Sequence, residues 1–143
     1  AARGLPLVVV GDGPLRSLFP ESVGFVPPRE LGPYFERAAV VVVPSRREGY
    51  GMVAREAMAH GRPVVATAVG GLLDAVEDGV TGLFVPPGDV AFLREAIAGL
   101  LHDDARRVRL GEAGRRRAVA TFARGRVDGE WRRAYDDALR NGG

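Results

Sequence analysis

Residues 44–66 read PSRREGYGMVAREAMAHGRPVVA, and this stretch decides the fold. It follows a β-branched run and ends in an apolar one, both typical of strands buried in a parallel sheet. Between them, Gly49 and Gly51 allow the backbone to turn and to approach a ligand closely. A helix is expected at 51–60, with Gly61 as its C-terminal stop. The stretch therefore predicts a strand, a glycine loop, a helix and a second strand.

Short β-rich runs alternate with helical ones on both sides of this stretch. Strands are expected at 5–10, 23–26, 40–43, 63–66 and 82–85, and helices at 29–38, 51–60, 72–77 and 89–101. Such alternation in a small domain predicts βαβ units with right-handed crossovers. The predicted fold class is therefore α/β, a Rossmann-like parallel sheet flanked by helices. Ligands bind such sheets beyond the carboxyl ends of the strands, where the loop at 44–51 lies.

The 143 residues divide in character near position 102. We expect an α/β domain at 1–102 and a C-terminal helical extension at 103–143 that packs on it. The extension is rich in Arg and could bind nucleic acid, but acidic residues are interspersed, as on a solvated helical face. No nucleic-acid partner is therefore expected. The chain has no Cys, which excludes disulfides and zinc-thiolate sites and makes the cytoplasm the expected compartment.

The start of the expected helix at 51–60 is a candidate phosphate site. Its first amides, those of Met52 and Val53, have no partner within the helix and point at whatever lies in front of it. These N–H groups and the helix dipole together favour an anion. Arg46 and Arg47 stand in the preceding loop and could reach a diphosphate, although we interpret them as exposed loop residues.

Two carboxylates flank this phosphate site, Glu48 in the loop and Glu56 within the helix. A carboxylate repels a phosphate, so these two residues must serve another group. Sugars offer neutral hydroxyl donors, which a carboxylate accepts in charge-assisted hydrogen bonds. One sugar on each side of a diphosphate would use both carboxylates, and that ligand is a nucleotide sugar. Taken singly, either residue is better explained as a helix-start charge or a solvent-exposed side chain.

The segment resembles the donor-site signature of glycosyltransferase family 4, the group 1 retaining glycosyltransferases, in which two glutamates are separated by seven residues. Glu48 and Glu56 have that spacing. Further matching stretches lie at 10–13, 24–26, 70–71 and 78–89. The resemblance implies the C-terminal, donor-binding half of a GT-B fold that lacks its first β-α unit, followed by C-terminal helices. It covers residues 5–102 in detail.

The resemblance also implies a role for each matching position. Glu48 would hold hydroxyls of the transferred sugar near the anomeric carbon, as the catalytic residue, and Glu56 would bind the ribose. The remaining substrate-binding positions would line the sugar and diphosphate or meet the base and nucleotide, largely through main-chain atoms: Gly49, Tyr50, Gly51, Met52, Val53, Gly11, Phe25 and Val26. Such enzymes use no metal and no cofactor beyond a nucleoside-diphosphate sugar, and the chain has no Asp-x-Asp pair for a divalent cation.

The chain departs from the family where the diphosphate needs positive charge. The Arg and Lys that the family places on its first strand and helix have no counterpart, and the chain has no Lys. An N-terminal acceptor domain is likewise expected but missing, so the chain alone is expected to be an inactive fragment. We expect the sheet to close over the gap, or an oligomer partner or swapped segment to cover exposed strand edges.

Three alternatives stay open at this point. The chain could be the donor half of a glycosyltransferase, a non-catalytic module that binds a nucleotide sugar, or another GT-B enzyme such as a sugar-nucleotide epimerase. Peripheral attachment to a membrane through the absent domain also stays open. The donor sugar, its base and the acceptor are not specified by any residue of this sequence.

Overall fold

The structure, a computed structural model, describes residues 6–122. The chain forms two compact units, Ala1–Arg37 and Ala38–Gly143, and each is described by itself. The sequence-based division at residue 102 is a different one and stays a prediction.

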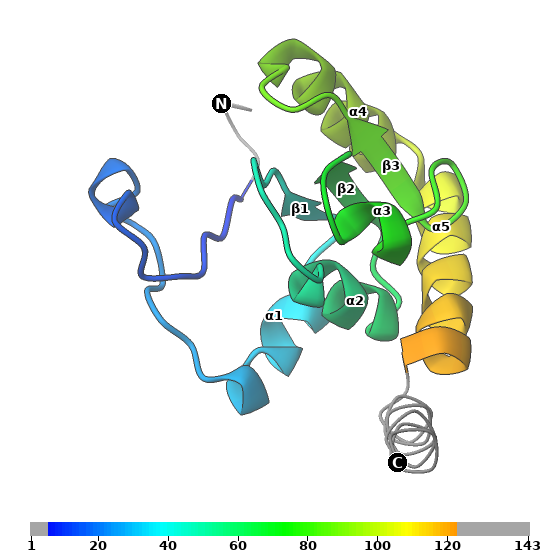
Figure 1. Cartoon of the computed structure of the whole chain (residues 1–143), viewed down its shortest axis with the longest axis horizontal. Coiled ribbons are helices and arrows are strands. Elements are labelled where there is room, and N and C mark those ends of the chain that lie inside the picture. Colours follow the sequence, from blue (N-terminus) through cyan, green and yellow to red (C-terminus); the bar gives the residue numbers. More distant parts are fainter. Residues whose placement is uncertain (1–5, 123–143) are drawn as a thin grey trace, which may run out of the picture. The chain divides into compact units, whose positions relative to one another are not determined.

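A three-stranded parallel sheet forms the centre of the second unit (Figure 1). Its strands are β1 (Val41–Val43), β2 (Val64–Thr67) and β3 (Gly82–Val85), in the order β1-β2-β3. Val42 lies opposite Val65, and Val65 lies opposite Leu83. All four residues of β2 are buried, which agrees with its apolar composition and central place in the sheet.

Within residues 38–122, four α-helices accompany this sheet, namely α2 (Met52–Ala59), α3 (Leu72–Ala75), α4 (Val90–His102) and α5 (Asp104–Arg117). A π-helical turn, η3 (Ala118–Phe122), follows α5. The core between the sheet, α4 and α5 contains Val65, Val85, Leu100 and Leu110, all at most 1% exposed. The α/β parallel fold that the sequence predicts is therefore confirmed. The described part of the expected C-terminal extension is α5 with η3; residues 123–143 lie outside the described range.

The limits of α2 and α4 agree with the expected ones to within one residue, and those of α3 to within two. Asp89 accepts a hydrogen bond from the Phe92 amide (2.9 Å) and caps α4. Asp103 does the same for α5 through the Arg106 amide (2.8 Å). At the end of α2, Gly61 adopts φ 68° and its amide donates to the Met58 carbonyl (2.8 Å), as in a Schellman motif.

The first unit contains short elements, namely the 3₁₀ turns η1 (Arg16–Leu18) and η2 (Pro28–Glu30) and the helix α1 (Gly32–Arg37). The strands expected at 5–10 and 23–26 are wrong, because the described residues form only an isolated parallel bridge between Val10 and Gly24. The bridge does not extend, since Gly11 (φ 138°) and Gly24 (φ 84°) leave the strand conformation. The helix expected at 29–38 is shorter, beginning just before Pro33.

Two glycines in helices of the second unit should respond to alanine in opposite ways. A Cβ at Gly111 of α5 would overlap the Gly61 carbonyl and lie 3.0 Å from its carbon, whereas nothing lies within 4 Å of a Cβ at Gly99 in α4. We expect Gly111→Ala to lower the free energy of unfolding by about 2 kcal/mol. Gly99→Ala should raise it by about 1 kcal/mol through helix propensity. Denaturant unfolding of both variants would test this, and equal shifts would contradict the packing of α5 against Gly61.

Candidate functional site

The loop at 44–51 leads from the carboxyl end of β1 into the start of α2, at the edge of the sheet where ligands bind in this fold class. Gly51 is the N-cap of α2 and adopts φ 75°, a left-handed conformation that side chains disfavour. Its amide donates to Glu48 Oε1 (3.2 Å). The first amides of α2, including those of Met52 and Val53, follow directly after this cap, as the sequence predicts.

Glu48 is partly buried and holds the loop together through three of its oxygens. One carboxylate oxygen accepts from the Gly51 amide, and the other accepts from Ser45 Oγ (3.3 Å). Its main-chain carbonyl accepts from the Gly71 amide (3.0 Å). A carboxylate has about four acceptor positions, so these two bonds leave acceptor capacity for ligand hydroxyls.

The turn at Gly70 and Gly71, after β2, packs against this loop backbone to backbone. A Cβ at Gly70 would overlap the Glu48 carbonyl, and one at Gly71 would lie 2.6 Å from Tyr50 Cα. Only glycine therefore permits this approach. The buried hydroxyl of Thr67 donates to the Ser45 carbonyl, which ties the beginning of the loop to the end of β2.

Helix α2 presents one face to the interior and another to solvent. Its buried residues are Ala54, Arg55, Ala57 and Met58. Met52 and Val53 are 53% and 45% exposed, and Glu56 is partly exposed. Because Glu56 stands four and three residues after Met52 and Val53, the three lie on the same side of the helix. The structure thus places Glu56 on the same helix face as the start of the candidate phosphate site.

Sequence reasoning missed one feature of this site, the contact between Tyr50 and Arg55. Arg55 Nε donates to the Tyr50 carbonyl (2.9 Å), and the guanidinium carbon lies 4.0 Å from the centroid of the Tyr50 ring. Arg55 is only 9% exposed, and this burial lowers the pKa of its guanidinium below the ordinary value. The available signal was an Arg on the otherwise apolar face of an amphipathic helix.

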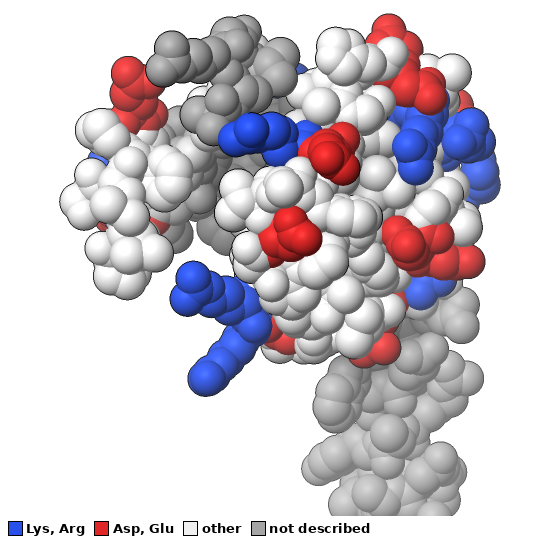
Figure 2. Space-filling view, turned by 90° about the horizontal axis from the view of Figure 1, so that it is seen from above, with Lys and Arg blue, Asp and Glu red and all other residues white. Residues whose placement is uncertain are grey.

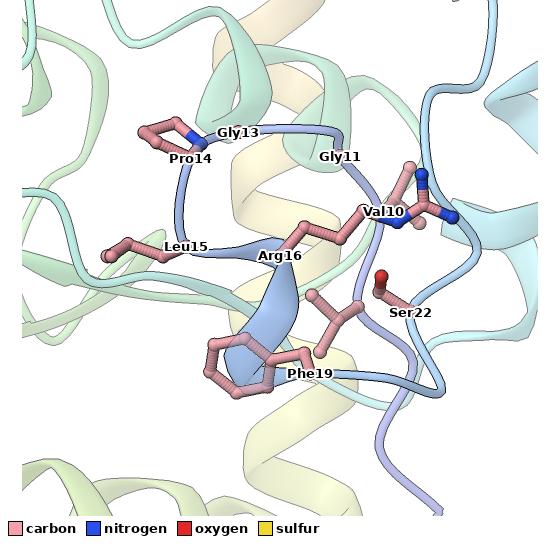
Figure 3. A pocket seen from close by; sticks show the side chains of 9 residues that line it. Val10, Gly11, Gly13, Pro14, Leu15, Arg16, Phe19 and Ser22 are labelled. Carbon is pink, nitrogen blue, oxygen red and sulfur yellow. The ribbon is translucent and has the colours of Figure 1, made fainter.

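Gly11, Phe25 and Val26, the remaining predicted site residues, belong to the first unit. Gly11 donates its amide to the Gly24 carbonyl (2.8 Å) and lines a shallow pocket of about 300 Å³ (Figure 3). In Figure 3 the Arg16 side chain extends past Val10 toward the segment that carries Ser22. Phe25 is 71% exposed and Val26 partly exposed; neither lines this pocket.

Charged side chains on the face shown in Figure 2 are of both signs and lie scattered among uncharged ones. Within residues 6–122, no three His, Asp or Glu side chains lie together in a group that could hold a metal ion. In the same part of the chain, every helix is too short or too polar to cross a bilayer. Arg46 and Arg47 are exposed in the loop before Glu48.

The fold and the loop define a Rossmann-like domain with a glycine-and-carboxylate site at the carboxyl ends of its strands. The chain belongs to the family "Glycosyl transferases group 1", whose model matches residues 1–103. The resemblance found in the sequence is thereby confirmed, including the expected C-terminal domain of the GT-B fold.

Two curated proteins match this chain over part of their length. The chain is 51% identical over 87 residues to D-inositol 3-phosphate glycosyltransferase of Corynebacterium aurimucosum, covering 61% of this chain and 21% of the relative. It is 43% identical over 110 residues to the enzyme of that name from Corynebacterium efficiens, covering 77% and 25%. The chain thus spans about a fifth to a quarter of the length of these relatives.

Solved structures agree with the fold. Sucrose-phosphate synthase from Thermosynechococcus elongatus superposes with a TM-score of 0.86 at 36% identity, over 94% of this chain and 38% of that one. Anabaena HepE in complex with UDP-glucose superposes with a TM-score of 0.82 at 22% identity, over 91% and 40%. The second likeness is one of fold alone.

Proposed function

We propose that this chain is the donor-binding half of a retaining, metal-independent glycosyltransferase that moves a sugar from a nucleoside-diphosphate sugar to an acceptor. The observation that carries the proposal is the segment from Glu48 to Glu56. Within nine residues it combines a carboxylate with unused acceptor positions, a glycine loop, the start of a helix and a second carboxylate on the solvent side of that helix. The family to which the chain belongs supports the reaction class.

In this proposal each part of the segment has one task. Glu48 holds hydroxyls of the transferred sugar. The anomeric carbon of this sugar then lies between the loop at 44–51 and the acceptor. The amides of Met52 and Val53 stabilise the negative charge that builds on the departing diphosphate, and each well-placed donor of this kind contributes ~3–4 kcal/mol. Glu56 accepts hydrogen bonds from the ribose hydroxyls. The acceptor is held by a separate domain of the whole protein.

Glu56→Ala is expected to weaken nucleotide binding at least tenfold. A hydrogen bond to a charged group contributes about 1.5–3 kcal/mol, and tenfold corresponds to about 1.4 kcal/mol. The measurement is calorimetric titration of the chain with UDP, GDP and ADP, which also identifies the base. Glu95→Ala, an exposed glutamate within α4, is the matched control and should bind like the unmodified chain. The proposal fails if the folded chain binds none of these nucleotides, or if both variants bind equally.

A further inference from the structure

Arg55 is a charged side chain on the buried side of α2, where the neighbouring buried residues are apolar or small. Arg is rarely buried to this degree unless it is paired, because its charge loses the surrounding water. Burial of Arg55 lowers the pKa of its guanidinium, while Tyr50 and Asp74 act in the opposite direction. The contacts of the buried guanidinium must therefore compensate for its loss of water.

The contacts of Arg55 are made to the middle of the glycine loop. The guanidinium donates through Nε to the Tyr50 carbonyl and lies 4.0 Å from the centroid of the Tyr50 ring. Tyr50 stands between Gly49 and Gly51, and the residue is 49% exposed. Arg55 thus fixes both the main chain and the ring of this residue.

The same loop is supported at its other side by main-chain atoms. Gly71 approaches the Gly49 carbonyl and Tyr50 Cα so closely that no Cβ fits, and its amide donates to the Glu48 carbonyl. The loop therefore has support from the turn after β2 and from Arg55. Arg55 itself lies on the buried face of α2, whereas Met52, Val53 and Glu56 lie on the exposed side.

We propose that Arg55 is a positioning residue, which holds the loop at Gly49–Gly51 in the conformation that receives the transferred sugar of the donor. This inference rests on the proposed function and adds a residue to it. Arg55 acts through Tyr50, so its loss should affect the part of the ligand that the loop contacts. The nucleoside part, which Glu56 holds from the exposed face of α2, should be affected little.

The test compares UDP with UDP-glucose in calorimetric titrations of the chain and its Arg55→Met variant. UDP-glucose binding should weaken about tenfold, since a charge-assisted hydrogen bond and a cation–π contact are both lost. UDP binding should change less than twofold. Arg55→Lys, which keeps the charge but lacks the planar group, should restore part of the loss. Glu56→Ala is the control with a different pattern, because it should weaken both ligands by the same factor.

A merely structural role for Arg55 would lower the melting temperature and leave the ratio of the two dissociation constants unchanged, and that result would overturn the inference. Should Arg55→Met not fold, Tyr50→Leu replaces it, because this exposed side chain can be changed while the Arg55 hydrogen bond to the main chain remains. It should change the same ratio in the same direction, and an unchanged ratio again counts against the inference. If the unmodified chain binds neither ligand, the proposed function for a UDP-sugar donor is wrong, and not only the role of Arg55.

Discussion

Gly71→Ala is expected to destabilise the second unit by about 3 kcal/mol, at the upper end of the range for overpacked interiors. The added Cβ would overlap the Gly49 carbonyl and lie 2.6 Å from Tyr50 Cα and 2.8 Å from the Gly49 carbonyl carbon. All of these are backbone atoms, which cannot rotate away as a side chain does. The loop must therefore move, and the hydrogen bond from the Gly71 amide to the Glu48 carbonyl is lost with it.

Thermal unfolding would measure this effect, and a fall in melting temperature of about 10 °C is expected for a protein of this size. UDP-glucose binding should be abolished at the same time, because the loop and Glu48 are displaced together. Gly49→Ala is the matched control for stability, since nothing lies within 4 Å of a Cβ placed there. A Gly71→Ala variant with the same melting temperature as the unmodified chain would show that the turn and the loop are not in this contact.

Glu48→Gln is expected to weaken UDP-glucose binding between about tenfold and a hundredfold, because hydrogen bonds to charged groups contribute about 1.5–3 kcal/mol. Glutamine has the same shape, and its amide oxygen can still accept from the Gly51 amide in place of Oε1. Its NH₂ group, however, cannot accept from Ser45 Oγ or from a sugar hydroxyl. The loop should therefore keep its path while the sugar loses its acceptor.

Calorimetry with UDP-glucose and with UDP would separate the loss of the sugar contact from a displacement of the loop. UDP lacks the transferred sugar and should therefore bind Glu48→Gln nearly as well as the unmodified chain. Glu95→Gln, on the exposed side of α4, makes the same chemical change away from the loop and should bind both ligands normally. Equal UDP-glucose affinities for Glu48→Gln and this control would remove Glu48 from the donor site.

Much of the second unit could be predicted from the sequence, because its signals are local. The β-branched run before Pro44 and the apolar run after Arg62 became β1 and β2, each within one residue of the expected limits. Gly61 predicted the end of α2, and the caps of α4 and α5, Asp89 and Asp103, likewise act on amides only three residues away. The placement of Glu48 before the start of α2 needed only the order of residues along the chain.

The strands expected in the first unit failed for a physical reason. A strand exists only with a partner, and a two-stranded pairing with no third strand is of marginal stability. Val8 and Leu7 are apolar enough for a strand, but they are 61% and 76% exposed in the structure. Composition alone does not show whether a neighbouring strand is there to pair with them.

The supports of the glycine loop were also beyond sequence reasoning, because they join residues distant in the chain or depend on rotamers. Gly71 follows Glu48 by more than twenty residues, and nothing in the sequence shows that their backbones touch. Arg55 could equally have been a solvated helix residue, and only the structure shows that it turns inward to Tyr50. Site residues could thus be predicted by type, whereas the contacts that hold them could not.

The backbone contact between Gly71 and the loop also distinguishes positions that tolerate substitution from positions that do not. Because the contacts of Gly71 and Arg55 hold the loop, substitutions at the exposed positions 46 and 47 are expected to leave its path unchanged. Such positions can therefore change at little cost in folding. The paired glycines have no such freedom. The contact that holds the loop in place thus leaves its exposed positions free to vary.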